Sequence, residues 1–389
     1  MKITFITNYM THHQLPFANA LYGLIGDDFT FIETNNMDEE RMNMGWSIDK
    51  SKYPYIHSFE NSIYDEIIEQ GEVVILGGTH QVYLGKRLDN KKLTFRYYER
   101  LYKTGQLKAY IPSSYKRNVI EHTNRKEDPV YLLCAGAYVA SDFSIFGAYP
   151  EKMLKWGYFP EFEEQDVDKL LEEKDCKEIL WTGRMIDWKQ PLMPLKAMNI
   201  LKKQGVEAHL TMIGDGPYRS KVEEYIISHN LSDSVKVLDF MSPENVREYM
   251  KKSLVYLMTS NMQEGWGAVV NEAMNCGCAV VASYGAGSVP YLINDGTNGI
   301  VFDYKSHKSL ATCIKKLLED VQMAKVLGSE AYKTISNEWN PGEAADRFVK
   351  LCRNLLEGNL VMEDNGPLSK AYNIKPSKGF KLCKDGGWR

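Results

Sequence analysis

The chain contains no apolar run of roughly 18 residues, so no segment is expected to cross a membrane as a helix. Its seven cysteines are an odd number and include neither a Cys-x-x-Cys pair nor a His-Cys cluster, which argues against a disulfide framework and a zinc site. The first residues enter a strand pattern without the features of a signal peptide. These absences predict a cytoplasmic protein with reduced thiols.

A strong excess of one charge is also absent. Lys and Arg number 47 and Asp and Glu number 51, giving a formal net charge of −4, which does not favour nucleic acid as a partner. The chain has 389 residues, of which 44% are apolar. This length exceeds what one hydrophobic core usually serves, so we expect two domains.

Strand and helix patterns alternate through both halves of the chain, which favours an α/β fold with two doubly wound parallel sheets. An acidic stretch without periodicity, 156–177, resembles a surface connector. We therefore predict an N-terminal domain at 1–158 and a C-terminal domain at 159–345. The helix and tail at 346–389 either pack back on the first domain or stay loose. The expected strands are 2–7, 29–33, 73–76, 93–97 and 130–134, then 179–182, 209–213, 235–240, 255–258, 279–282 and 300–302.

Polar loops follow several strands of the first half, at the sheet edge where open α/β folds bind ligands. His12 and His13 follow the first strand and are candidate ligand contacts, or polar residues at a helix start. His80 and Glu99 follow later strands and are candidates to face the second substrate, His80 as a catalytic residue. Alternatively, His80 caps a helix and Glu99 pairs with Arg96 or Arg100.

Basic and aromatic residues are dense between Lys86 and Arg117. A solvated helical surface is one interpretation of this run. The other is a patch that meets anionic lipid or a pyrophosphate-linked acceptor. The second interpretation predicts a peripheral contact with the inner face of the membrane.

Three loops of the second half carry polar residues at strand ends. Gly183 allows close approach of a ligand to the backbone, and Arg184 with Lys189 supplies two cations suited to a pyrophosphate. Gly214 begins a tight turn after the next strand. The third loop leads into Gln263–Ser283. In this segment two carboxylates, separated by seven residues, lie on either side of a helix start. Such an arrangement suits a polyhydroxylated ligand that bears phosphate.

The segments GRMIDWKQ, IGDGP, EGWGAVVNEAMNCGCAVVAS and GAGSVPYLINDGTNGIVF occur in this order. Together they resemble the C-terminal half of family 4 glycosyltransferases over about residues 178–305. The resemblance implies a GT-B fold, in which two Rossmann-like domains face each other across a cleft. It also implies a retaining enzyme that uses a nucleotide-sugar donor.

The resemblance implies roles for the residues of this chain that match the family's motifs. Arg184 and Lys189 would neutralise the donor diphosphate, and Glu264 would accept hydrogen bonds from sugar hydroxyls. Glu272 would hold the ribose. The remaining contacts would come from the backbone: Gly183 and Gly214 at the strand ends, Gly265, Trp266 and Gly267 toward the sugar and distal phosphate, and Phe240 and Met241 at the base.

Three departures from the family pattern stand out. Trp266 stands where the family more often has Phe, and Tyr291 where it commonly has Glu. The loop 8–13 replaces the Gly-Gly loop found after the first strand in many members, which puts a donor-phosphate role of this loop in doubt and draws attention to His12 and His13.

The predicted reaction is transfer of a hexose or related sugar from a nucleotide diphosphate to a hydroxyl acceptor. The acceptor would be a glycan, a lipid-linked intermediate of cell-surface polysaccharide synthesis, or a small molecule. No cofactor is expected, and no metal, because no dependable Asp-x-Asp signal is present. The alternatives are a non-catalytic sugar-nucleotide-binding protein and a GT-B phosphorylase or epimerase.

Overall fold

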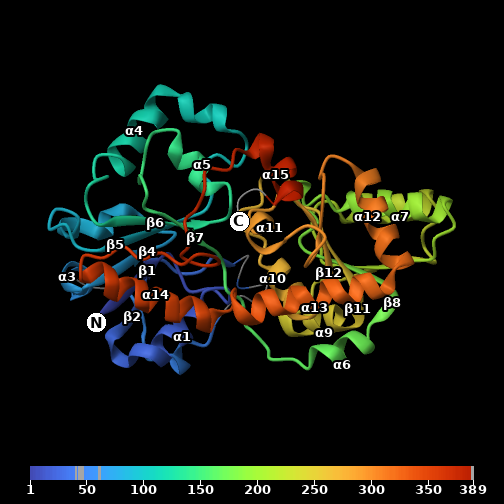
Figure 1. Ribbon diagram of the computed structural model, residues 1–389, viewed down its shortest axis with the longest axis horizontal. Coiled ribbons are helices and arrows are strands. Elements are labelled where there is room, and N and C mark those ends of the chain that lie inside the picture. Colours follow the sequence, from blue (N-terminus) through green and yellow to red (C-terminus); the bar gives the residue numbers. More distant parts are fainter. Residues whose placement is uncertain (40–41, 43–47, 60–62, 387–389) are drawn as a thin grey trace. The chain divides into compact units, whose positions relative to one another are not determined.

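The computed structural model describes residues 1–39, 42, 48–59 and 63–386, so the last three residues of the predicted tail lie outside it. The chain divides into two compact units, each built on one parallel sheet covered by helices (Figure 1). The first unit comprises Met1–Glu161 and Trp339–Ile374, and the second comprises Phe162–Glu338 and Lys375–Arg389. The predicted α/β class with two Rossmann-like sheets is confirmed.

In the described residues, the sheet of the first unit has seven strands in the order β3-β2-β1-β4-β5-β6-β7. The order reverses between β1 and β4, so the loops after these two strands meet at a topological switch point. The short edge strands β3 and β7 were not predicted. The strands are β1 (Ile3–Thr7), β2 (Phe29–Glu33), β3 (Ile56–Ser58), β4 (Val73–Leu76), β5 (Thr94–Tyr98), β6 (Val130–Ala135) and β7 (Met153–Trp156).

Helices cover both faces of this sheet, which explains why β1, β4 and β6 are buried along their whole length. The α-helices are α1 (Leu15–Ile25), α3 (Ile63–Gln70), α4 (Pro112–His122), α5 (Val139–Ser144) and α14 (Pro341–Leu356). Short 3-10 helices are η1 (Gly26–Asp28), η2 (Lys50–Lys52), η3 (Gln81–Arg87) and η4 (Gln106–Tyr110).

The second unit repeats this plan with six parallel strands in the order β10-β9-β8-β11-β12-β13. Its switch point lies between β8 and β11. The strands are β8 (Asp175–Thr182), β9 (His209–Ile213), β10 (Val235–Leu238), β11 (Ser253–Met258), β12 (Ala279–Ser283) and β13 (Ile300–Phe302). The helices are α6 (Val167–Glu172), η5 (Asp187–Lys189), α7 (Leu192–Lys203), α8 (Arg219–Ser228), α9 (Pro243–Lys252), α10 (Val269–Asn275), α11 (Val289–Leu292), α12 (His307–Glu319), α13 (Val321–Asn337), η6 (Pro376–Lys378) and α15 (Gly379–Asp385).

The C-terminal part of the chain contributes to both units. In the first unit, the ring of Phe348 on α14 lies 4.9 Å from the ring of Phe95, and the Leu368 amide donates to the Lys155 carbonyl at 2.8 Å. In the second unit, Lys384 on α15 forms an ion pair with Asp295 at 2.9 Å. The sequence prediction had instead ended the second domain at 345.

Arg87 departs from the expected basic surface because it is fully buried. Its guanidinium donates to the carbonyls of Ile68 at 3.0 Å and Gly71 at 2.5 Å, and to the Thr94 hydroxyl at 3.1 Å. A guanidinium has five donors, so it can satisfy several loop carbonyls at once. Arg87 therefore stabilises the core of the first unit.

No helix in the described part of the chain combines the length and the apolarity that spanning a bilayer requires.

Backbone crowding at the strand ends of the second unit yields a stability prediction. A Cβ added to Gly214 would lie 2.1 Å from the Gly183 carbonyl oxygen, and Gly214 has a φ of +138°. We expect Gly214→Ala to destabilise the unit by more than the roughly 1–2 kcal/mol of left-handed backbone alone. Gly205→Ala is the control, because Gly205 has a φ of +72° and nothing within 4 Å. Urea unfolding of both variants checks this; equal losses would contradict it.

Candidate functional site

The switch point of the second unit brings the loops after β8 and β11 into contact. The Asn261 amide donates to the Trp188 carbonyl at 2.8 Å, and the Thr259 hydroxyl donates to the Lys189 carbonyl at 2.7 Å. The Trp181 indole donates to the same hydroxyl at 2.8 Å. These bonds fix the two loops to each other at the carboxyl edge of the sheet, where open α/β folds bind ligands.

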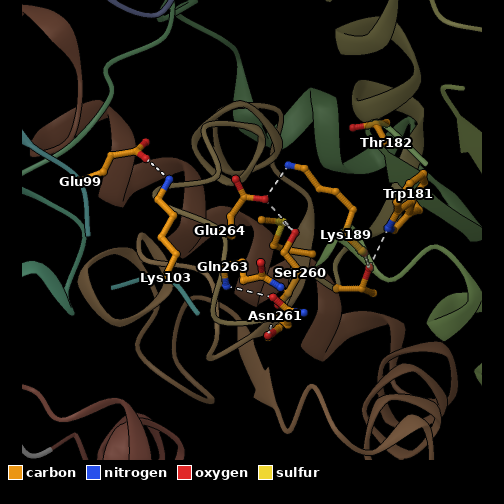
Figure 2. A network of polar contacts seen from close by, with 12 residues as sticks. Glu99, Lys103, Trp181, Thr182, Lys189, Ser260, Asn261, Gln263 and Glu264 are labelled. Carbon is orange, nitrogen blue, oxygen red and sulfur yellow. Dashed lines mark hydrogen bonds and ion pairs between the residues drawn. The ribbon is translucent and has the colours of Figure 1, made fainter. Parts of the chain in front are cut away.

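An ion pair joins the two loops. The Lys189 Nζ lies 2.6 Å from the Glu264 Oε2, and the Ser260 hydroxyl donates to the same oxygen at 2.9 Å (Figure 2). The two charged side chains are 17% and 14% exposed, so they are mostly desolvated yet accessible. The turn before Glu264 is held by Asn261, whose carbonyl accepts from the Glu264 amide at 3.1 Å. A cation and a carboxylate therefore lie in direct contact at the ligand-binding edge.

Arg184 and the two predicted glycines surround the start of the first loop. Arg184 is exposed, and its guanidinium lies 5.8 Å from the centre of the Trp188 ring. The Gly183 amide donates to the Ile213 carbonyl at 3.0 Å, next to Gly214. Since a side chain at Gly214 would meet the Gly183 carbonyl, the two backbones pack against each other without intervening side chains.

The Gly265–Gly267 loop leads into α10. Gly267 has a φ of +90°, and a Cβ there would lie 2.5 Å from the Met258 methyl group. Trp266 is fully buried, and its indole donates to the Asn271 Oδ1 at 2.9 Å. Its ring lies 6.2 Å from the ring of Tyr291, so two departures from the family pattern are neighbours. The Trp266 side chain therefore anchors the loop from within the core of the second unit.

Glu272 lies on α10 and is 8% exposed. Burial raises the pKa of its carboxyl to about 7, against the opposing effect of Arg247. Arg247 pairs with Glu163 at 3.0 Å. No hydrogen bond to the Glu272 carboxyl occurs among the described residues, so this carboxyl has the capacity to accept from a ligand.

Phe240 and Met241 lie beyond β10, which ends at Leu238 and not at Phe240 as predicted. The cause is the neighbouring strand, because Leu238 pairs with Ile213, the last residue of β9. Phe240 is 51% exposed and follows the carboxyl end of its strand. Both residues are thus on the edge of the sheet where the base contacts were expected.

In the first unit, three of the predicted substrate contacts, His12, His13 and Glu99, belong to one group of side chains. The rings of His12 and His13 lie 3.8 Å apart, and the His13 ring stacks on Tyr158 with centroids 5.6 Å apart. The Tyr158 hydroxyl donates to Glu99 at 2.6 Å, and Glu99 also pairs with Lys103 (Figure 2). The alternative prediction, that Glu99 pairs with Arg96 or Arg100, is wrong, because the partners of Glu99 among the described residues are Lys103 and Tyr158.

The contacts of His80 fit the alternative interpretation, in which it caps a helix. It is exposed and precedes η3, and its Nδ1 accepts a hydrogen bond from the Val82 amide at 3.1 Å. In the neutral ring this bond places the proton on Nε2. His80 is a helix cap in this structure, and nothing in its contacts marks it as catalytic.

Several site residues have no role in the sequence prediction. Ser260 holds Glu264, and Asn271 holds Trp266. The Asn271 Nδ2 and the Ser288 hydroxyl are buried without a hydrogen-bond partner among the described residues. The sequence does not show that these residues lie near the Glu264 loop, although the position of Ser260 after a strand end could have drawn attention to it.

The described part of the chain contains no group of three or more His, Cys, Asp and Glu residues able to hold a metal ion.

Comparison with known proteins identifies the domain that carries this site. Residues 162–334 match the family model described as "Glycosyl transferases group 1". The match covers Arg184, Lys189, Glu264 and Glu272.

Relatives and solved structures agree with this match. The chain is 26% identical to an α-D-kanosaminyltransferase of Streptomyces kanamyceticus over 46% of its own length and 45% of the relative's. It is 28% identical to the amylovoran biosynthesis glycosyltransferase AmsK of Erwinia amylovora, over 46% and 44%. The chain thus spans about half the length of these relatives. The structure of HepE of Anabaena in complex with UDP matches 90% of this chain and 99% of its own, with a TM-score of 0.67 and 16% identity. The fold is that of the GT-B glycosyltransferases.

Proposed function

Because the second unit carries a domain of the group 1 glycosyl transferases, we propose that this protein is a retaining glycosyltransferase. It transfers a sugar from a nucleotide-diphosphate sugar to a hydroxyl acceptor. The observation that carries the proposal is the ion pair of Lys189 and Glu264 at the switch point of the second sheet. A carboxylate suited to sugar hydroxyls and a cation suited to phosphate are placed side by side.

The chemistry follows from where charge develops. Breaking the anomeric C–O bond gives the sugar oxocarbenium character and leaves negative charge on the departing diphosphate. In the proposed binding mode, Lys189, Arg184 and the amides of the Gly265–Gly267 loop face the diphosphate. Their attraction to the diphosphate grows as the bond breaks, so they stabilise the transition state more than the bound donor. Glu264 holds the sugar hydroxyls.

Retention is proposed to follow a front-face route. The leaving phosphate itself helps to deprotonate the acceptor hydroxyl, on the same face of the sugar. In the second unit, the Lys189 ammonium and the Ser260 hydroxyl both contact the Glu264 carboxylate and position it in this scheme. The front-face route requires no nucleophile from the enzyme.

UDP is the first nucleotide to test, since a structural neighbour was solved with UDP. We expect UDP or a UDP-sugar to raise the melting temperature, because a ligand that binds only the folded state stabilises it by mass action. A ligand at about 100 times its Kd contributes about 2.7 kcal/mol. A thermal-shift screen of UDP, GDP, ADP and dTDP sugars checks this, with Lys189→Met as the control that should lose the shift. If no sugar nucleotide shifts the melting temperature, the donor proposal is wrong.

The acceptor is proposed to be a glycan or lipid-linked intermediate of cell-surface polysaccharide synthesis. The relative named for amylovoran biosynthesis supports this class. In the first unit, the group formed by His12, His13, Tyr158 and Glu99 offers aromatic faces and a carboxylate, the chemistry that suits sugar rings and hydroxyls. A cytoplasmic location follows from this proposal.

We propose that the reaction needs no metal, because Lys189 and Arg184 supply the positive charge for the diphosphate. EDTA is therefore expected to leave the turnover of donor unchanged, measured as nucleotide release. Activity that disappears with EDTA and returns only with Mg²⁺ or Mn²⁺ would contradict this. The same assay separates a transferase from a binding protein, which releases no nucleotide, and from a phosphorylase, which needs inorganic phosphate.

A further inference from the structure

Large apolar side chains are exposed on one short stretch of the first unit. Leu107 is 85% exposed and Tyr110 is 66% exposed, and both lie on η4. They are three residues apart, so in a 3-10 helix they point in the same direction. Ile120, on the following helix α4, is 55% exposed. The two elements contact each other, and contiguous exposed apolar side chains mark sites of interaction with proteins or membranes.

Cations accompany these apolar side chains. Lys108 lies between Leu107 and Tyr110, and Lys116 and Arg117 precede Ile120 by four and three residues, which places them on the same face of α4. All three cations are exposed, and none forms an ion pair among the described residues. The sequence contains no Asp or Glu from 101 to 120. The surface is therefore basic as well as apolar.

The scaffold beneath this surface is well packed. The Gln106 amide donates to the Asp142 carboxylate at 2.8 Å and to the Ser141 hydroxyl at 2.7 Å. Buried Asn118 of α4 donates to the Tyr102 hydroxyl at 2.6 Å. Both elements are thus fixed to the core of the first unit, so the backbone that carries the exposed side chains is already ordered before binding.

We propose that the surface formed by Leu107, Lys108, Tyr110, Lys116, Arg117 and Ile120, the η4–α4 surface, docks on an anionic lipid bilayer. Leucine, isoleucine and tyrosine enter the boundary between headgroups and acyl chains, and the three cations remain at the level of the anionic headgroups. Clusters of acid-free basic residues beside apolar ones fit an anionic membrane, whose surface attracts each Lys or Arg. The docking does not depend on sugar transfer, so its test uses neither donor nor acceptor.

The test is co-sedimentation of the full chain with vesicles. Vesicles of phosphatidylcholine mixed with phosphatidylglycerol are expected to bind the protein, and vesicles of phosphatidylcholine alone to bind it far more weakly. Each cation contributes roughly a fivefold change in affinity. The variant K108Q/K116Q/R117Q is therefore expected to bind about a hundredfold more weakly. L107S/Y110S is expected to lose binding as well, at unchanged charge.

Matched variants separate this surface from general effects. K52Q/K126Q/K350Q removes the same charge from exposed lysines elsewhere in the first unit, and L24S/L360S replaces two other exposed leucines. Both are expected to bind like the unmodified protein, with melting temperatures that confirm folding. Equal binding to the two vesicle types, unchanged binding of the Gln triple variant, or a dimer in solution that L107S/Y110S abolishes would each overturn the proposal.

Discussion

Replacing Glu264 by Gln, or Lys189 by Met, is expected to lower kcat/KM for sugar transfer by about 10²–10³-fold, the usual effect of removing one group that stabilises transition-state charge. Glu264→Gln keeps the shape of the side chain but removes the charge that orders Lys189 and Ser260. Lys189→Met removes the cation aimed at the diphosphate. Steady-state kinetics with the donor found in the thermal-shift screen measure both effects.

A second ion pair in the same unit provides the control. Lys177 and Glu207 pair on the surface, with side chains 49% and 65% exposed. Lys177→Met and Glu207→Gln are expected to leave kcat/KM within about twofold, because exposed pairs contribute little. The double variant of Lys189 and Glu264 should lose little more than either single variant, since the two groups act together. Full activity in Glu264→Gln would exclude the proposed site.

Glu272→Gln is expected to raise stability at about pH 8 and to leave it nearly unchanged at about pH 4.5. The pKa of the buried Glu272 carboxyl is about 7 in the folded state, against an ordinary value of 4.5. Between these values the folded protein holds a proton that the unfolded chain has lost, so stability falls as pH rises. The difference of about 2.5 pKa units lowers the free energy of unfolding by about 3 kcal/mol at pH 7 and above. Gln at this position stays neutral, so the variant does not lose this stability. Unfolding of both proteins across this range measures it.

The same substitution should weaken donor binding. If Glu272 accepts hydrogen bonds from the ribose, donor affinity increases as the carboxyl ionises around pH 7, and Glu272→Gln lowers affinity about tenfold and removes this pH dependence. Glu178→Gln is a suitable control, because burial also raises the pKa of that carboxyl, which lies in the middle of β8 and not in the loops at the carboxyl edge of the sheet. A Glu272→Gln variant with unchanged stability and unchanged affinity would contradict both expectations.

The sequence was sufficient to predict the sheet of the second unit and to place several candidate site residues at its carboxyl edge. Its buried strands are apolar runs, and Gly183, Lys189 and Glu264 lie in the loops that follow two of them. Because parallel strands end at one edge, position in the sequence was enough to bring these residues together. Periodicity could not reveal that Lys189 and Glu264 touch, or that Ser260 fixes them, because these contacts depend on how two loops pack.

The first unit was harder to predict, for two physical reasons. Its edge strands β3 and β7 are short and pair on one side, so they lack a strong apolar pattern. The sequence also does not show what surrounds an individual polar residue in the folded protein. Arg87 lies in a basic run but is buried among carbonyls, and His80 caps η3. Tyr158, which connects His13 to Glu99, comes from a loop far along the chain.

Retention of configuration can be observed by ¹H NMR of the sugar released from the donor. We expect nucleoside diphosphate and, as the first sugar product, the anomer with the configuration it had in the donor, at a rate that Glu264→Gln reduces by about 10²-fold or more. Release of the opposite anomer first, or undiminished release by Glu264→Gln, would contradict this expectation.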